Sequence, residues 1–388
     1  MTLSPAQDLT VIENQARSLL ASGQIQEAEI CVRPVLAKGS APIRLWRLMI
    51  AILKQQRRFR EMGQIQSMLV DASPGDLSLR FDLAETMLML GEFQRGWHEY
   101  HYRYSLPHTV RIERKVQMPR WDGRPIPGKT LLIHDEQGYG DTFQFLRMIS
   151  WAKQKSGAKI VLEIDPLTLS FAKRMQGIDV IIPLGTLPPP FDVHCELMSL
   201  PMALNLKMSD LPGKIPYLSA NPDHIQRWRK RLNELPRPLV ALVWAGRPTP
   251  DPNRSLPLAS LAPLALEGLT YLSLQIGPKA VEAKSAPDGM KLIDLSQEIM
   301  GFDDTAAILQ LVDLLISIDS APVHLAGAMA RPTWVMLQHI ADWRWFLEGE
   351  NSPWYPSLRL FRQTKQGEWG SVAASIAAEL SVWRSKLG

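Results

Sequence analysis

Ten short apolar segments, separated by amphipathic or polar stretches, follow one another from Thr130 onward and restrict the folds open to this chain. They read TLLIHDE, KIVLEID, DVIIPL and FDVHCEL in a first group, then LVALVWAG, TYLSLQIG, KLIDLS, DLLISID, PTWVML and LRLFRQ in a second. Continuous apolar strands that alternate with helices are typical of parallel sheets covered on both faces. A Pro-rich boundary, ELPRPL, separates the groups. The pattern therefore predicts two doubly wound α/β halves.

The first 105 residues have a different pattern, which is helical and periodic. Ile25, Phe59 and Phe93 are spaced by 34 residues. Three positions after them come Ala28, Met62 and Gly96. This period resembles the tetratricopeptide repeat, in which a small residue after the turn lets the second helix pack closely on the first. The alternative is three helical hairpins whose spacing coincides.

These patterns divide the chain into five regions. We expect tetratricopeptide-like repeats over 1–105, a linker over 106–129, an N-terminal Rossmann-like half over 130–236, a C-terminal half over 237–363 and a C-terminal helix over 364–388. Within the linker, GRPIPGKT at 123–130 matches the Walker A pattern. It precedes a strand instead of following one, and its prolines have no N–H to offer a phosphate. We therefore predict that this segment does not bind nucleotide.

Composition excludes several classes of protein. The 388 residues are 46% hydrophobic and 21% charged, as expected of a globular chain. A formal charge of +4 is small for a nucleic-acid partner. Only Cys31 and Cys195 are present, which rules out a disulfide framework or a multi-cysteine metal site. With neither a leader pattern nor an apolar run of membrane length, we expect a cytoplasmic protein without a transmembrane segment.

The first strand of the N-terminal half leads into a glycine-containing turn with candidate chemistry. Gln137, Gly138, Gly140 and Asp141 follow TLLIHDE and precede the helical segment FQFLRMISWAKQ. Two glycines allow a tight bend and a close approach by a ligand, and Asp141 falls in the first turn of a helix at the carboxyl end of a strand. This is where open α/β sheets bind ligands. The alternative for Asp141 is a carboxylate that only complements the helix dipole.

Two segments of the C-terminal half are suited to a phosphate. The strand VALVWAG ends in a polar loop with Arg247, Arg254 and Ser255 before an amphipathic helix. The strand DLLISID delivers a second group to the start of another helix: Asp319, Ser320, Ala321, Pro322 and His324. Free N–H groups of the first turn, a hydroxyl and an imidazole would face one point above the sheet. The alternative is a Ser-capped helix with a packed histidine.

Five ordered blocks of the chain resemble the bacterial tetratricopeptide-repeat glycosyltransferase family. They are LLIHDEQGYGDTFQFLR, ALVWAGRPTPDPNRSLPL, YLSLQIG, GFDDTAAILQLVDLLISIDSAPVHLAGAMARPTWVML and DWRWFLEGENSPWYPSLRLFRQ. That family is related in its two Rossmann-like halves to the lipopolysaccharide heptosyltransferases of glycosyltransferase family 9. The resemblance covers nearly the whole chain. It implies a GT-B fold in which the C-terminal half holds the nucleotide-sugar donor and the N-terminal half holds the acceptor.

The resemblance also implies roles for particular residues. The family's catalytic carboxylate falls on Asp141, and its basic residue facing the donor phosphates falls on Arg254. The segment that binds the donor diphosphate falls on Asp319 to Leu325, where Ser320 replaces the family's Thr and retains a hydroxyl. Heptosyltransferases commonly carry Lys where this chain has Arg254, and the two are not interchangeable at a bidentate site. The resemblance therefore leaves the donor sugar open.

Further residues are expected around the cleft. On the donor side they are Trp244, Gly246, Gln275, Gly277, Phe302, Asp304 and Thr305. On the acceptor side we add Asp342 and Arg344, for which interdomain packing of a Trp/Arg cluster is the alternative. No compelling Asp-x-Asp metal motif lies at a strand end, so we expect no metal and no cofactor other than the nucleotide-sugar co-substrate.

The resulting hypothesis is a metal-independent, inverting glycosyltransferase whose repeats recruit a protein or glycan acceptor. Asp141 would accept the acceptor proton, while cationic groups and a helix N-terminus would stabilise the departing diphosphate. Two alternatives stay open. One is a non-catalytic scaffold with a relic cleft, and the other is a nicotinamide-dependent oxidoreductase, against which stands the missing G-x-G-x-x-G motif after either first strand.

Overall fold

The computed structural model describes residues 5–39, 41–105, 116–249 and 251–387. The chain divides into two compact units. The helical unit comprises Met1–Arg111 and Asp342–Leu347, and the α/β unit comprises Ile112–Ala341 and Glu348–Gly388. Residues 106–115 of the predicted linker lie outside the described residues.

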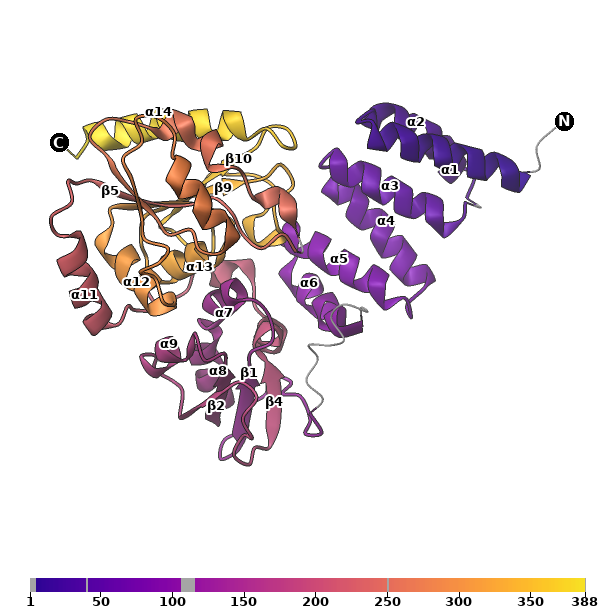
Figure 1. Cartoon of the computed structure of the whole chain (residues 1–388). Helices are drawn as coiled ribbons and strands as arrows, with labels where there is room; N and C mark the ends of the chain where they lie inside the picture. The colour runs from indigo at the N-terminus through magenta and orange to yellow at the C-terminus, as the bar shows by residue number, and fades with distance from the viewer. Residues whose placement is uncertain (1–4, 40, 106–115, 250, 388) are drawn as a thin grey trace. The chain divides into compact units, whose positions relative to one another are not determined.

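The described residues of the helical unit form three consecutive helical hairpins, which can be followed in Figure 1. Their helices are α1 (Pro5–Ala21), α2 (Ile25–Leu36), α3 (Ile43–Gln55), α4 (Phe59–Ala72), α5 (Leu77–Met89) and α6 (Phe93–Tyr100). The second helix of each hairpin begins at one of the residues Ile25, Phe59 and Phe93, which the sequence places 34 apart. The prediction of an all-helical N-terminal region is confirmed.

The turn inside each hairpin has a left-handed residue two positions before the second helix. Gly23 and Gly91 have φ of +78° and Arg57 has φ of +57°. Glycine adopts this conformation without the Cβ clash that other residues suffer. Later in the third hairpin, a Cβ on Gly96 would lie 2.7 Å from Cδ2 of Leu88. A small residue is therefore required where α6 crosses α5.

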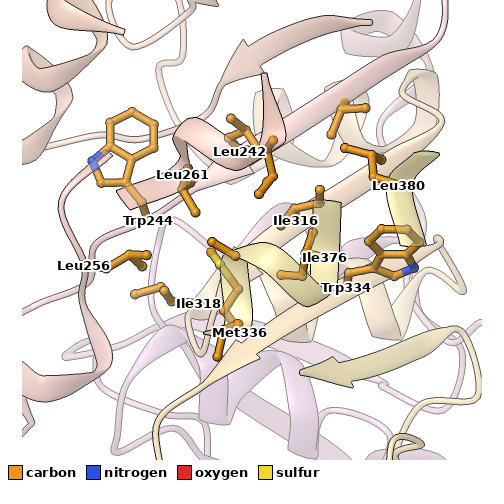
Figure 2. Close-up of a cluster of buried hydrophobic side chains, with 14 of the residues drawn as sticks. Leu242, Trp244, Leu256, Leu261, Ile316, Ile318, Trp334, Met336, Ile376 and Leu380 are labelled. Atoms are coloured by element: carbon orange, nitrogen blue, oxygen red, sulfur yellow. The ribbon is translucent and has the colours of Figure 1, made fainter. Parts of the chain in front are cut away.

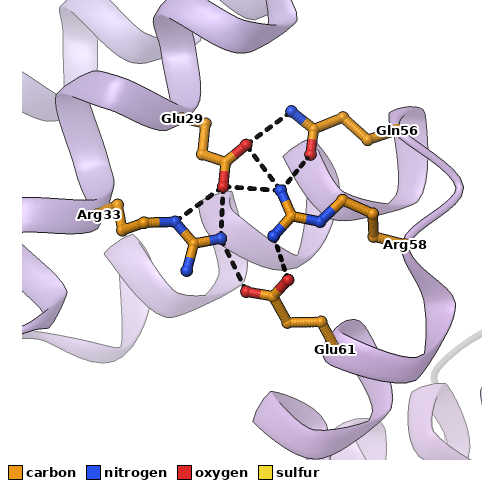
Figure 3. A network of polar contacts seen from close by, with 5 residues as sticks. All are labelled: Glu29, Arg33, Gln56, Arg58 and Glu61. Atoms are coloured by element: carbon orange, nitrogen blue, oxygen red, sulfur yellow. Dashed lines mark hydrogen bonds and ion pairs between the residues drawn. The ribbon is translucent and has the colours of Figure 1, made fainter.

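A polar network joins the first two hairpins (Figure 3). The carboxylate of Glu29 accepts hydrogen bonds from Gln56 (2.7 Å), Arg58 (2.8 Å) and Arg33. Both arginines also pair with Glu61 on α4, Arg33 at 2.7 Å. Exposed ion pairs contribute about 0.2–1 kcal/mol each, so each pair of this network adds little to the stability of the unit.

A segment from far along the sequence completes the helical unit. The 3₁₀-helix η7 (Trp343–Trp345) packs beside α5 and α6. The ring of Trp343 lies 5.3 Å from that of Trp97, edge to face, and Phe346 stacks at 6.2 Å on Phe93. The predicted C-terminal half, 237–363, is thus interrupted by residues that belong with the helices.

The α/β unit holds two parallel sheets. The first has the order β3-β2-β1-β4, with β1 (Thr130–His134), β2 (Lys159–Ile164), β3 (Val180–Pro183) and β4 (Val193–Glu196). Its helices are α7 (Tyr139–Phe145), α8 (Met148–Ser156), α9 (Leu169–Lys173) and α10 (Leu200–Leu204). The next helix, α11 (Pro222–Leu232), packs on α12 (Phe302–Leu311) of the second half.

The second sheet has the order β10-β9-β8-β5-β6-β7. Its strands are β5 (Leu239–Val243), β6 (Thr270–Ser273), β7 (Leu292–Asp294), β8 (Leu314–Ile318), β9 (Thr333–Leu337) and β10 (Leu358–Arg362). Its helices are α12 (Phe302–Leu311), α13 (Ala321–Ala328) and α14 (Trp369–Ser385). Short 3₁₀-helices in the two units are η1 (His101–Ser105), η2 (Leu197–Ser199), η3 (Met208–Asp210), η4 (Pro252–Arg254), η5 (Leu258–Leu264) and η6 (Pro278–Ser285). All ten strands coincide with the apolar segments of the sequence, and the predicted parallel α/β architecture is confirmed.

The core of the second half lies between its sheet and α14 (Figure 2). Ile316 and Leu242 from the two central strands are fully buried, as are Ile376 and Leu380 from α14. Fully burying such a side chain contributes about 1.5–3 kcal/mol. This cluster holds the strand ends that carry the candidate site.

Candidate functional site

The order of the second sheet creates a switch point between its two central strands. The chain runs outward from β5 through β6 to β7, and then returns to start again at β8 on the other side of β5. Loops at the carboxyl ends of two such strands diverge and leave a crevice, where open α/β sheets bind ligands. The two phosphate-suited segments predicted from the sequence follow β5 and β8, so the topology brings them to this crevice.

The loop after β5 is shaped around Arg254. Its Nη2 donates to the carbonyl oxygen of Arg247 at 3.2 Å, and a Cβ on Gly246 would lie 3.0 Å from its Nε. The N–H of Gly246 donates to Oγ of Ser255 at 3.1 Å. The Nε of Arg254 is buried and has no hydrogen-bond partner within the described residues. An unsatisfied, buried guanidinium nitrogen is suited to an anionic ligand.

Helix α13 begins directly after β8. Ser320 is its N-cap residue and has extended backbone, and Pro322 lies in the first turn, following Ala321. The hydroxyl of Ser320 contacts Oγ of Ser317 at 2.9 Å, so it does not cap the helix. His324 is 4% exposed, and its Nε2 lies 3.7 Å from Oδ1 of Asp319. The helix thus has the predicted Pro start, hydroxyl and imidazole.

The glycine turn after β1 forms the start of α7. Oδ2 of Asp141 accepts a hydrogen bond from the N–H of Gly138 at 3.1 Å. This contact is the helix-terminus role that the sequence left as the alternative. Gln137 and Asp141 are half-buried and Gly138 is exposed. A capping contact uses one carboxylate oxygen and does not preclude proton transfer by the same group.

The starts of α7 and α13 approach each other closely. A Cβ on Gly140 would lie 3.0 Å from Cδ2 of His324, 3.6 Å from its Nε2 and 3.8 Å from Cα of Ala321. The absence of a side chain at Gly140 therefore lets the two helix N-termini meet. Asp141, in the first turn of α7, stands next to the glycine that contacts His324. Residues predicted separately in the two halves are brought to one place.

Aromatic rings surround this junction. Phe302 packs edge to face on Tyr139 at 4.9 Å and on Phe143 at 5.0 Å. The guanidinium of Arg247 lies 5.9 Å from the ring of Tyr139. Burial is the main cause that raises the pKa of Tyr139, and the carboxylate of Asp165 adds to it. Tyr139 was not predicted from the sequence, although it sits between the two glycines of the turn.

Three residues predicted to border the donor have side chains committed to the fold. Gln275 is 4% exposed, and its Oε1 accepts from the backbone N–H of Trp244 (3.1 Å) and Ala245 (2.8 Å). Trp244 is fully buried, and its indole donates to Glu282. Thr305 is 6% exposed, with its hydroxyl directed to Gly301. Gln275 stabilises the end of β5, because its amide oxygen accepts from buried backbone N–H groups that need a hydrogen-bond partner. Gly277 has φ of +76° and opens the turn that starts η6.

Asp304 connects two helices. Its carboxylate is 1% exposed and accepts from Trp228 Nε1 (3.0 Å), His224 (2.6 Å), Arg227 and the N–H of Met300 (2.9 Å). Burial favours a higher pKa for Asp304, but these hydrogen bonds outweigh it and lower the pKa. With so many donors, this carboxylate joins α11 to α12. A place for Asp304 at the nucleobase or ribose stays a prediction.

Asp342 and Arg344 belong to the helical unit. Oδ1 of Asp342 accepts from the backbone N–H and the guanidinium of Arg344, at 3.0 and 2.8 Å. The guanidinium also lies 4.1 Å from the ring centroid of Trp343. These are packing contacts within one short segment, and a place for Asp342 and Arg344 on the acceptor side stays a prediction. The sequence could not reveal that the two residues belong to the helical unit, since the insertion is short and uninterrupted by turn residues.

A buried carboxylate beside the site was missed. Asp135 follows β1, is 6% exposed and contacts Oγ1 of Thr142 through both oxygens at 2.9 Å. Burial raises its pKa to about 6, against the hydrogen bonds of Thr142, and the charge of Asp141 raises it further. Its position at the end of an apolar segment was the available signal, because an acid there must lie at the carboxyl edge of the sheet.

One group of buried side chains has the composition of a metal site. Ligand atoms of His134, His194 and Glu196 lie within 4.8 Å of one another, and Nε2 of His134 is 3.2 Å from Nδ1 of His194. These residue types bind Zn²⁺ in many proteins. Here Arg120 already pairs with Glu196 at 2.7 Å and balances its charge. The cluster lies on β1 and β4, within the first sheet.

The segment that matches the Walker A pattern begins with a close packing contact. Gly123 has φ of +85°, and a Cβ there would lie 1.8 Å from the carbonyl oxygen of Ala203. The segment 123–129 precedes β1, as the sequence indicated. Among the described residues, no helix combines the length and apolar character needed to cross a bilayer.

No family model matches the chain. Protein FlbA of Caulobacter vibrioides is 27% identical over 357 residues, which are 82% of this chain. The chain spans 59% of the length of this curated relative.

Solved structures resemble about two thirds of the chain. A glycosyl transferase of family 9 from Veillonella parvula DSM 2008 superposes with a TM-score of 0.51 at 12% identity, over 68% of this chain and 98% of that chain. The ADP-heptose lipopolysaccharide heptosyltransferase II of E. coli reaches 0.48 at 13% identity, over 65% and 98%. The first of these likenesses shows that the fold is similar to that of GT-B glycosyltransferases.

Proposed function

We propose that this chain is a nucleotide-sugar-dependent glycosyltransferase of the tetratricopeptide-repeat type. It would transfer a sugar with inversion, and without a metal, to a protein or glycan acceptor recruited by the helical unit. The observation that carries the proposal is the meeting of α7 and α13. There Gly140 brings the carboxylate-bearing start of one helix against His324 and the start of the other.

Each side of this junction has the chemistry that one substrate needs. Asp141 is a carboxylate placed to accept a proton from an acceptor hydroxyl. Arg254, Ser320, His324 and the N–H groups that open α13 are donors for a diphosphate leaving group. Fixed donors of this kind supply the charge stabilisation that a metal supplies elsewhere. The proposal for metal independence rests on that equivalence.

The donor is tested by binding. ADP, UDP, GDP and CDP and their sugars would be screened for an increase in the melting temperature of the full chain. A ligand present at 100 times its Kd stabilises the native state by about 2.7 kcal/mol. Arg254→Ala should weaken the hit by roughly tenfold or more, because a charged hydrogen bond to phosphate is lost. A chain that binds none of these compounds would favour the scaffold alternative.

The base is tested by Asp141→Asn, measured with saturating donor. Loss of a general base costs about 10²- to 10⁴-fold in rate, whereas loss of a helix-terminus carboxylate costs about 0.3–1 kcal/mol in stability and no turnover. Asp223→Asn is the matched control, since Asp223 lies in the first turn of α11. Wild-type transfer by Asp141→Asn would contradict the assignment. Glu136, which lies two residues after β1, would then be the next candidate for the base.

Recruitment by the helical unit is supported by its separate compactness and by its lack of donor motifs. Its surface carries apolar side chains, of which Ile30 on α2 is 70% exposed. Ile30→Glu should weaken transfer to a macromolecular acceptor and leave donor binding unchanged. Equal loss of both would contradict this part of the proposal.

A further inference from the structure

We infer that Tyr355 is a positioning residue that keeps the proton of neutral His324 on Nε2, so that His324 serves the site as a hydrogen-bond donor and not as a base. This inference rests on the proposed function, because it assigns His324 to the leaving diphosphate.

The contact between the two side chains is direct and buried. Nδ1 of His324 lies 3.0 Å from the hydroxyl of Tyr355, and the rings meet at 5.8 Å with an interplanar angle of 63°. Tyr355 is fully buried. Its ring packs on α13 one turn after His324, where a Cβ on Gly327 would lie 2.5 Å from it. Glycine at this position lets Tyr355 reach the imidazole.

A buried cation decides which partner donates in this hydrogen bond. The guanidinium of Arg147 lies 4.7 Å from the ring centroid of Tyr355, and Arg147 is 3% exposed. Backbone carbonyls of Pro212 and Trp354 hold it, at 3.1 and 2.9 Å. The oxygen of a phenol is fixed by its ring, and a nearby positive charge favours the rotation of the O–H bond that points the proton away from the charge. The proton of Tyr355 then points to Nδ1 of His324.

The neighbouring phenol has its proton engaged elsewhere. The hydroxyl of Tyr217 donates to the carbonyl oxygen of Phe143 at 2.8 Å and accepts from Arg147 at 3.1 Å. Burial is also the main cause that raises the pKa of Tyr355 well above its usual value, so its hydroxyl keeps a proton to donate. Tyr217 is also a hydrogen-bond partner of Tyr355. Because the oxygen of Tyr217 already accepts from Arg147, we infer that the proton of Tyr355 goes to His324.

The protonation of the other nitrogen of the imidazole follows from this donation. A neutral imidazole has one N–H, and with Nδ1 accepting, the N–H must be at Nε2. That nitrogen lies 3.7 Å from the carboxylate of Asp319 and faces the backbone of Gly140. A protonated Nε2 offers a hydrogen to a phosphate oxygen and cannot accept one from an acceptor hydroxyl. The base is thereby left to Asp141.

The tautomer can be read without any substrate. Long-range ¹H–¹⁵N correlation of the full chain labelled with ¹⁵N-histidine separates a protonated from an unprotonated ring nitrogen, and the spectrum of His324→Gln assigns the signal. We expect His324 to show N–H at Nε2 and an unprotonated Nδ1. In Tyr355→Phe we expect a mixture of tautomers. Tyr271→Phe is the matched control, because it removes another fully buried hydroxyl, one directed to Leu264.

An Nδ1–H tautomer in the wild-type chain, or an unchanged tautomer in Tyr355→Phe, would overturn the inference. A second pair of variants applies even if Tyr355→Phe does not fold. The amide of glutamine reaches the position of Nε2, whereas that of asparagine reaches only Nδ1. With the best-binding nucleoside diphosphate from the set ADP, UDP, GDP and CDP, His324→Gln should keep affinity within about threefold and His324→Asn should lose about tenfold. The reverse order would overturn the inference. Absence of nucleotide binding together with the Nε2–H tautomer would refute the proposed function and leave the positioning role of Tyr355 intact.

Discussion

Asp135 allows a test of the site that needs no substrate. Its carboxylate lies at the end of β1, 6% exposed, and burial raises its pKa from 3.8 to about 6. A raised pKa means that the native state holds the proton more tightly than the unfolded chain does. The stabilising effect of the protonated group is complete below about pH 4 and is lost as the pH rises through about 6.

The size of the destabilisation by ionised Asp135 follows from its pKa shift. A change of about two pH units at about 1.36 kcal/mol per unit gives roughly 3 kcal/mol of destabilisation from ionised Asp135 above pH 6. Asp135→Asn removes the charge and keeps the size. The amide oxygen of the variant can still accept from the N–H of Glu136, which in the wild-type chain donates to Oδ1 of Asp135 at 3.0 Å. We expect the variant to unfold at higher urea concentration than wild type at pH 8, by about 1–3 kcal/mol, and to show little gain at pH 4.5.

Thr142→Val is the companion variant with the opposite sign. Thr142 is fully buried, and its hydroxyl stabilises the charged form of Asp135. Removing the hydroxyl at constant shape should destabilise the chain more at pH 8 than at pH 4.5, and the effect should shrink in the Asp135→Asn background. The assay is urea unfolding followed by tryptophan fluorescence at pH 4.5, 6 and 8. A gain from Asp135→Asn that is equal at all three pH values, or a loss at pH 8, would refute the reasoning.

Three other substitutions probe the contacts that build the fold and the site. Gly140→Ala should displace His324 and weaken nucleoside diphosphate binding by about tenfold or more, measured by titration calorimetry. Gly138→Ala is the control and should leave this binding unchanged, because its Cβ would lie 3.4 Å from Oδ2 of Asp141, an ordinary contact distance. Gly23→Ala should lower the stability of the helical unit by about 1 kcal/mol in thermal unfolding because φ is +78°, and Gly75→Ala, with open space around its Cβ and no positive φ, should have no such effect. Asp304→Ala should cost about 3–5 kcal/mol in urea unfolding because it leaves buried donors without an acceptor, and a cost below about 1 kcal/mol would contradict the role given to that carboxylate.

Local patterns in the sequence predicted the elements well. Each apolar segment became a strand because a parallel sheet buried on both faces requires unbroken apolar runs. The period of 34 marked helix starts because the same turn, with a left-handed residue two positions earlier, recurs in each hairpin. Arg57 hid this regularity in the second hairpin, where a non-glycine residue adopts φ of +57°.

Roles that depend on distant partners were not predictable in the same way. Asp304 and Gln275 both sit at strand or helix ends near the crevice, where polar side chains suggest ligands. In the fold, Asp304 accepts a hydrogen bond from Trp228 on α11, and Gln275 accepts one from Ala245 just after β5. The segment at 342–347 likewise follows a strand of the second sheet but packs on helices more than 240 residues earlier. Whether such a side chain binds a ligand or makes hydrogen bonds within the fold can be seen only in the three-dimensional structure.

For His324, packing and chemistry are compatible, although the sequence presents them as alternatives. An imidazole has two nitrogens on opposite edges of the ring, so one can be fixed in the core while the other faces a ligand. Nδ1 is fixed by Tyr355 at 3.0 Å, and Nε2 faces Gly140 and Asp319. Burial of the ring is therefore compatible with the phosphate-binding role proposed for His324, because a fixed ring loses less rotational freedom on binding. The same reasoning applies to Asp141, whose hydrogen bond from Gly138 orients the carboxylate proposed to accept the proton.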